Sequence, residues 1–417
     1  MAFSLLILFT LAAFTLQSSM WKLKEWSLEE LESLKISVLG ADEFAKGGFQ
    51  NLLGFGSFGN NTKLFTINPF VLAHSDYEAA WGRSGCYPRL KLDEENIEYF
   101  SEGINIGVAN TSTDIEGRNG IAYLSADSSS SSAHDFFIID TKDQSDFKII
   151  SSLNTGPGIN ALEIAGPYAF VAQASSVNQL QIIDIHNRMT PQLISQLRLT
   201  LPTPTTTAPV ATSIFYSKGF IYLGSAKWGG PEFTIIDVSN INDPFIVGTF
   251  ETNTVINDIY VQDNKAYLAT ADEDQLRVLD MEDKRAPVLL SEFSSSGWQT
   301  QTGKVLDFFE GTLGFGRTVG GFNVTTNHET FLFSSSSESY ASKDIPGGVY
   351  GILIQPEYTI LLTHALGHEL QVWSSGFSKL IFDVPLGTNP VRMSCDGFAL
   401  YFATGDSKGV SLLKLYE

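Results

Sequence analysis

The chain has 417 residues, enough for two or three ordinary domains or for one large propeller or barrel. Phenylalanine (30), tyrosine (14) and glycine (36) are abundant and only 17% of residues are charged, which favours many short strands over a helical bundle. The 46 acidic and 26 basic residues leave a formal charge of −20, which opposes binding to nucleic acid and to anionic lipid. We therefore expect a mainly β protein with no nucleic-acid partner.

The first residues, Met1–Leu16, carry no charge and are almost wholly apolar. As a helix they would reach roughly 24 Å, the short end of a membrane span. One interpretation is a cleaved secretory signal peptide. The other, which we favour, is a retained helix, because the first basic residue, Lys22, follows the apolar run instead of preceding it. The apolar side chains that would contact a membrane or a filament core are Leu5, Leu6, Ile7, Leu8, Phe9, Leu11, Phe14 and Leu16.

This apolar N-terminus without a basic leader resembles a mature type IV pilin over residues 1–35. The resemblance implies a filament subunit or a surface adhesin that associates through this helix with copies of itself or with a membrane. Leu5 departs from the pilin pattern, because many pilins carry a glutamate at this position.

The segment that follows keeps a helical pattern. In Trp26–Leu39 the leucines and Val38 recur at helical spacing, and Gly40 is a helix-ending residue. We therefore predict a helix over residues 1–39, an anchor or a filament stalk. Residues 40–85, rich in glycine and aromatic side chains, are predicted to form a linker or neck.

A five-residue motif, in which apolar positions surround a variable one and an aspartate usually follows, is repeated along the rest of the chain. The strong copies are Phe136–Asp140, Leu180–Asp184, Phe233–Asp237 and Leu276–Asp280, and the weaker ones are Thr330–Ser334, Leu370–Ser374 and Val410–Lys414. The spacing, roughly 40 to 52 residues, suits four-stranded propeller blades. We predict a single β-propeller of about seven four-stranded blades over residues 86–417.

The aspartates that end the strong copies are predicted to be turn residues: Asp140, Asp184, Asp237 and Asp280. A short carboxylate accepts backbone N–H groups in an Asx turn, so a structural role explains these residues better than a catalytic one. In the third repeat we expect four strands, over residues 219–224, 231–238, 245–251 and 257–262.

Two of the copies, with the residues that follow them, resemble the LVIVD-repeat family of β-propellers: Leu180–Pro191 and Phe233–Pro244. The resemblance extends over residues 117–417 and is strongest in the first four repeats. It implies a propeller fold and an exported or cell-surface protein, and it implies no particular enzyme activity.

A propeller must join its last blade to its first, since an open ring leaves an unpaired edge. The chain from Phe398 onward supplies about two strands, so we expect Lys91–Gly107 to supply the other two. The only cysteines, Cys86 and Cys395, would then both lie in the closing blade. We predict a disulfide between them; the alternative is two free core cysteines.

Patterns that carry chemistry are sparse. His364 and His368 are the only closely spaced histidines, and they fall in a predicted turn, where two imidazoles do not share a helical face. No G-x-S-x-G nucleophile elbow occurs. We therefore predict no catalytic residue, no metal and no cofactor.

These observations support two functional hypotheses. The leading one is a non-catalytic cell-surface or extracellular protein, a pilin-like filament subunit or an adhesin that binds a surface protein or a glycan. The alternative is a secreted binding module for carbohydrate or peptide, with its signal peptide removed. An enzyme would require a cluster of histidine, arginine and carboxylates at the mouth of the propeller channel.

Overall fold

The computed structural model describes residues 34–37, 54–58, 61–65, 97–100, 103–107, 110–128, 132–143, 146–200, 209–295, 301–318, 328–334, 339–396 and 399–415. The chain divides into two compact units, Met1–Asp76 and Tyr77–Glu417. Within the described part of the chain, no helix is both long enough and apolar enough to cross a membrane.

The first unit contains a three-stranded antiparallel sheet. Its strands are β1 (Leu34–Ser37), β2 (Gly54–Phe58) and β3 (Asn61–Phe65), in that order. Only Gly59 and Asn60 separate β2 from β3, and a two-residue Gly-Asn connection is a strong hairpin signal. This hairpin lies inside the segment predicted to be a linker.

The helix predicted over residues 1–39 is wrong at Leu34–Ser37, which is strand β1. Apolar and polar residues alternate there with the period of two that suits a strand, and the segment pairs with β2. Residues 1–33, with the apolar side chains of the predicted anchor, lie outside the described residues.

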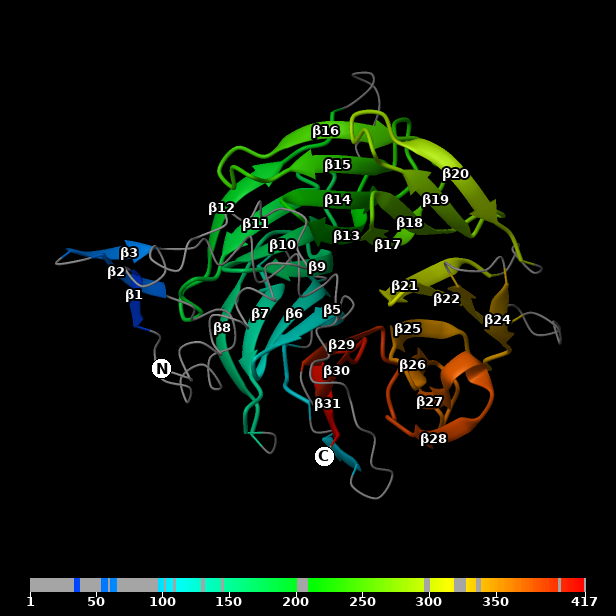
Figure 1. Ribbon diagram of the computed structural model, residues 1–417. Helices are drawn as coiled ribbons and strands as arrows, with labels where there is room; N and C mark the ends of the chain where they lie inside the picture. The colour runs from blue at the N-terminus through cyan, green and yellow to red at the C-terminus, as the bar shows by residue number, and fades with distance from the viewer. Residues whose placement is uncertain are drawn as a thin grey trace. The chain divides into compact units, whose positions relative to one another are not determined.

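The second unit contains six four-stranded sheets that are each built from consecutive strands (Figure 1). The first three consist of β5 (Asn110–Arg118), β6 (Ile121–Ser128), β7 (Phe136–Asp140) and β8 (Lys148–Leu153); β9 (Ile159–Ala165), β10 (Tyr168–Gln173), β11 (Leu180–Asp184) and β12 (Gln192–Leu197); and β13 (Ala211–Ser217), β14 (Phe220–Ser225), β15 (Phe233–Asp237) and β16 (Phe245–Phe250).

The next three consist of β17 (Ile256–Gln262), β18 (Lys265–Thr270), β19 (Leu276–Asp280) and β20 (Val288–Phe293); β21 (Gly303–Phe309), β22 (Thr312–Arg317), β23 (Thr330–Ser334) and β24 (Tyr340–Lys343); and β25 (Val349–Ile354), β26 (Tyr358–Thr363), β27 (Leu370–Ser374) and β28 (Leu380–Val384). A short 3₁₀ turn, η2 (Ser375–Phe377), lies between β27 and β28.

One further four-stranded sheet is built from both ends of this unit. It has the order β29 (Arg392–Asp396), β30 (Ala399–Ala403), β31 (Val410–Leu415) and β4 (Ile97–Phe100). The expectation that the two ends share a sheet is therefore confirmed, but the division is wrong. The C-terminal end supplies three strands instead of two, because Arg392–Asp396 also pairs into the sheet, and the N-terminal end supplies one.

The first strands of the sheets surround a central channel. Each of β5, β9, β13, β17, β21, β25 and β29 contacts the next, and β29 returns to β5, so the contacts close into a ring. Apolar clusters lie between neighbouring sheets; one joins Ile121 and Phe136 of the first sheet to Ile159 and Val171 of the second. A single small sheet cannot bury both of its faces, so each depends on its neighbours.

The repeated motif forms the third strand of every four-stranded sheet, from β7 to β31. The blade, however, is offset by one strand from the repeat read in the sequence. In the third repeat, residues 257–262 were expected to form the fourth strand, but they belong to β17, the first strand of the next sheet. The sheet that contains the third motif copy begins instead with β13. The connections before and after β16, residues 238–244 and 251–255, are both short, so local sequence does not determine where a blade begins.

Candidate functional site

The channel-lining strands share an irregularity near their start. In β5, β9, β13, β17, β21 and β25 the pairing with the second strand skips one residue, as in a β-bulge. The skipped residues, which we call the bulge residues, are Thr113, Asn160, Thr212, Asn257, Lys304 and Tyr350. All six are half-buried, so they form a partly open end of the channel, which we call the channel mouth.

Four consecutive bulge residues connect each blade to the next. Thr113 Oγ1 donates to the carbonyl of Ile159 at 2.6 Å, and Asn160 Nδ2 donates to that of Ala211 at 2.6 Å. Thr212 and Asn257 donate in the same way to the strands that follow them, at 2.6 and 2.7 Å. Short Thr and Asn side chains suit this role because they reach only to a neighbouring backbone.

Carboxylates deeper in the channel hold free backbone N–H groups of the next blade. Asp114 Oδ2 accepts the N–H of Leu162 at 3.0 Å, and Asp258 Oδ2 accepts that of Leu306 at 2.8 Å. Glu116 lies two residues after Asp114 and accepts the N–H of Ile164 at 2.6 Å. Asp307, at the corresponding position of β21, accepts the N–H of Ile354 at 2.8 Å. These carboxylates satisfy N–H groups at the inner edges of three sheets, on β9, β21 and β25, which have no further strand to pair with.

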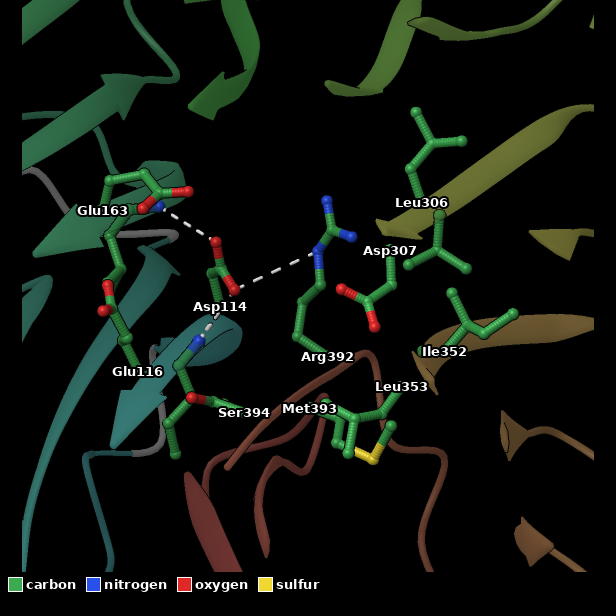
Figure 2. Close-up of a pocket in the computed structure, with 14 residues that line it drawn as sticks. Asp114, Glu116, Glu163, Leu306, Asp307, Ile352, Leu353, Arg392, Met393 and Ser394 are labelled. Atoms are coloured by element: carbon green, nitrogen blue, oxygen red, sulfur yellow. Dashed lines mark hydrogen bonds and ion pairs between the residues drawn. The ribbon is translucent and has the colours of Figure 1, made fainter. Parts of the chain in front are cut away.

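Arg392 lies near Asp114 of the neighbouring sheet, as Figure 2 shows, and near Asp258 on the far side of the ring. It lies on β29 at the position that Asp114 and Asp258 occupy on their strands. Its Nη1 lies 3.4 Å from Asp258 Oδ2, its Nε lies 4.0 Å from Asp114 Oδ1, and its Nη2 donates to the Asn257 carbonyl at 3.3 Å. These distances are long for charge-assisted hydrogen bonds, so the guanidinium is only loosely held.

Lys304 breaks the pattern of the bulge residues. Its side chain is half-buried and lies over the ring of Tyr350, 5.9 Å from the centroid, and no hydrogen bond or ion pair from its ammonium reaches any described residue. Burial and, second to it, the charge of Arg392 lower its pKa to about 8, while the charges of Asp258 and Asp114 act in the opposite direction. The mouth therefore holds a cation whose donors are unused within the described structure.

Tyr350, the next bulge residue, adds an aromatic ring beside Lys304, and a histidine ring stacks on it. The imidazole of His364 stacks on Tyr350 with centroids 3.6 Å apart and planes 10° apart, and His364 Nε2 lies 2.9 Å from the Pro390 carbonyl. A carbonyl only accepts, so Nε2 carries the proton and Nδ1 remains an acceptor. Burial lowers the pKa of His364, which keeps this ring neutral.

The four motif aspartates lie at the ends of third strands, away from this site in sequence and in hydrogen bonding. Asp140, Asp184, Asp237 and Asp280 each accept the N–H of the residue two positions later, at 2.8 to 3.1 Å. These are Asx-turn hydrogen bonds.

A second set of repeated polar residues was missed in the sequence, although the signal is visible there. The residue directly before the motif is acidic or an amide in six repeats: Asp135, Gln179, Glu232, Gln275, Glu329 and Glu369. Each is buried and accepts an N–H from the segment after the fourth strand of its blade, from Thr155, Leu199, Thr252, Ser295, Ile345 and Leu386. These hydrogen bonds hold the segment that connects the fourth strand of one blade to the first strand of the next.

The predicted cysteine pair is described only in part. Cys395 is buried in β29 within the cluster between the last two sheets, and it is not a free thiol. Cys86 lies outside the described residues, so the pairing stays a prediction. Among the described residues, no three histidine, cysteine, aspartate or glutamate side chains gather as a metal site.

Comparison with known families agrees with this architecture. The LVIVD repeat model matches the chain at residues 160–198 and 211–252. Two LVIVD repeats are therefore present. Each match spans nearly one whole sheet, from β9 to β12 and from β13 to β16, so one LVIVD repeat corresponds to one blade. No curated protein matches the sequence.

Solved structures resemble the chain in fold. A chain of the mitotic checkpoint complex is 12% identical with a TM-score of 0.57, and the match covers 78% of this chain and 94% of that one. Virginiamycin B lyase from Staphylococcus aureus is 12% identical with a TM-score of 0.55, covering 77% and 100%. The WD40 β-propeller domain of Doa1 is 12% identical with a TM-score of 0.53, covering 77% and 98%. At these identities the likeness establishes the β-propeller fold alone.

Proposed function

We propose that the protein is a non-catalytic binding module that holds a carboxylate group of a peptide or an acidic sugar at the channel mouth. The observation that carries the proposal is the Lys304 ammonium, half-buried beside the loosely held Arg392 and without a hydrogen-bond partner among the described residues. A partly buried cation with unused donors is costly unless an anion completes it.

The size of the channel limits where such a ligand can lie. The cavity between Asp114, Asp307 and Arg392 measures about 50 Å³, room for one or two water molecules. A ligand would therefore remain at the mouth, where the Lys304 ammonium and the His364 ring both lie against Tyr350.

A non-catalytic role agrees with how the carboxylates are used. Asp114 and Asp258 meet Arg392 just inside the mouth, the kind of cluster an enzyme would require, but each already accepts a backbone N–H of the next blade. Their carboxylate oxygens are used as acceptors for backbone groups of the neighbouring sheet, and a carboxylate held in this way is a poor general base.

Calorimetric titration tests the proposal with two kinds of probe, an oligogalacturonate and a short peptide offered as its free C-terminal acid or its amide. We expect the acid forms to bind, the amide to bind at least about tenfold more weakly, and Lys304→Gln to lose about tenfold in affinity. Binding should weaken as pH rises through about 8, because the Lys304 ammonium then deprotonates.

The control is Lys265→Gln, which removes an exposed lysine at the start of β18 and should leave binding unchanged. Acid and amide peptides of equal affinity, or a Lys304→Gln variant that binds as the parent does, would refute the site. The oligogalacturonate and peptide arms distinguish the two ligand sources.

We further propose that the protein is exported. The support is the apolar sequence Met1–Leu16. The filament and membrane roles predicted for the N-terminal helix depend on residues 1–33, which lie outside the described part of the chain. Mass spectrometry of the native protein decides between the alternatives: a mature N-terminus near residue 20 would indicate a cleaved signal peptide and remove the anchor.

A further inference from the structure

A second hollow lies between two neighbouring blades, away from the channel. It measures about 240 Å³ and opens between the sheet β17–β20 and the sheet β21–β24. The side chains that line it are mostly apolar: Tyr267, Leu276, Val278, Phe293, Phe308, Leu313 and Phe333, with Ser291, Glu292, Gly311 and Ser334 at the edge. We call it the aromatic groove.

Aromatic rings make its walls. Tyr267 and Phe308 stack with centroids 5.8 Å apart, and Phe293 meets Phe333 edge-on at 5.0 Å. These four rings are only partly buried, although they pack against a fully buried cluster. A dry apolar cavity of about 150 Å³ binds benzene, so the larger groove has room for the side chain of an aromatic or large aliphatic residue.

The strand at the edge of the groove exposes more apolar surface. Val288, Leu289 and Leu290 of β20 are consecutive, and their exposed fractions are 60%, 38% and 50%. Each of the other outer strands whose side chains are described, β8, β12, β16, β24 and β28, exposes a single large apolar residue. Apolar surface concentrated in this way beside an open groove is typical of a docking site.

The edge of β20 is poorly suited to strand addition. Its pairing with β19 skips Leu290, and a bulge of this kind interrupts the regular row of N–H and C=O groups that an added strand needs. Recognition here would therefore come from side chains that enter the groove and cover Val288 and Leu289.

The charge around the groove indicates the partner. Residues 272–292 contain seven acidic and three basic side chains, and the whole chain carries −20. Acidic side chains lie at both ends of β20. Glu282 and Asp283 precede it, followed by Lys284 and Arg285; Asp274, which also lies 3.6 Å from Arg277, accepts a hydrogen bond from Ser294 just after it, at 2.9 Å. Such a surface attracts and orients a basic partner.

We propose that the aromatic groove is a docking site for a protein segment that carries an aromatic or large aliphatic side chain between lysine or arginine residues. The apolar side chain fills the groove between Phe293 and Phe308, and the basic residues lie against the acidic side chains at the two ends of β20. This site is independent of the channel mouth.

Selection from a displayed library of random short peptides on the full-length protein tests the proposal. We expect enrichment of sequences with one aromatic or large aliphatic residue between basic residues. A synthetic peptide of the enriched sequence should bind at least about tenfold more weakly after Ser291→Phe, which fills the groove from an exposed position. Replacing the central residue of the peptide by alanine should have a similar effect, and added salt should weaken binding.

The matched control is Thr249→Phe, which adds the same ring at an exposed position on β16, outside the groove, and should leave affinity unchanged. Enrichment of acidic or wholly polar peptides, no enrichment, or equal affinity for the Ser291→Phe variant would overturn the proposal. Concentration-dependent dimerisation abolished by Ser291→Phe, measured by sedimentation, would instead assign the groove to a second copy of the chain.

Discussion

Single side chains in this protein hold backbone groups that the sheets leave unpaired. Glu329, directly before β23, accepts the N–H of Ile345 at 2.8 Å and the amide of Gln301 at 2.7 Å while remaining 4% exposed. Burial, together with a smaller effect of neighbouring Asp344, raises the pKa of Glu329 to about 7. This carboxyl therefore titrates near neutrality in the folded state.

We predict that Glu329 makes stability fall as pH rises from about 5 to about 8. Between its ordinary pKa and about 7, the folded state binds a proton that the unfolded state has lost, so folding is favoured at the acid end. In Glu329→Gln this contribution should vanish. The variant should fold, because Gln301 Oε1 has no partner among the described residues and can accept a hydrogen bond after an amide flip.

Urea unfolding of the parent and of Glu329→Gln at both pH values measures the difference. The two proteins should differ in the pH dependence of the unfolding free energy by an amount that grows toward pH 8. Parallel curves would mean that Glu329 stays ionised throughout.

At the scale of elements, a buried acid or amide before each third strand controls how one blade leads into the next. Glu232 accepts the N–H groups of Thr252 and Asn253, at 3.0 and 2.9 Å, and the Thr252 hydroxyl at 3.1 Å. These groups lie on the segment between β16 and β17, so one side chain fixes the crossing between two sheets.

Glu232→Ala should lower the free energy of unfolding by about 2 to 4 kcal/mol, because it leaves several buried donors without an acceptor. Chemical denaturation followed by circular dichroism measures the loss. Glu273→Ala, on an exposed turn of the next sheet, should change stability by less than about 0.5 kcal/mol. Equal effects from the two variants would show that the Glu232 hydrogen bonds add nothing net.

Strand positions were predictable at this scale because a strand's pattern is local. The bounds of β7, β11, β15 and β19 coincide with the four strong motif copies. The grouping of strands into blades was not, since it depends on which hairpin packs against which neighbour. The strand β1 was misassigned because four residues are too few for periodicity to separate a strand from a helix.

The whole molecule depends on closing the ring at one sheet. Strand β31 pairs with β4 from the other end of the unit, and β29 contacts β5. Removing this closure would expose the edge of β31 and the faces of two blades.

The predicted Cys86–Cys395 disulfide would reinforce that closure. It would close a loop of about 310 residues, for which chain entropy gives at most about 6 kcal/mol of stabilisation. We expect thiol titration of the denatured, non-reduced protein to find no free thiol, and Cys86→Ser to lower the free energy of unfolding by several kcal/mol, up to about 6. Two titratable thiols per chain would disprove the bond.

The sequence by itself determined that the protein consists of repeated packets of short strands, because apolar alternation, turn aspartates and Gly-containing turns act within a few residues of one another. Only the tertiary structure decided which side chains share a site. Lys304 and Arg392 come from different blades, and Phe293 and Phe308 reach the aromatic groove from two neighbouring sheets. Such contacts form when blades pack into a ring, and that packing fixes the rotation of each blade about the channel, which no local pattern encodes.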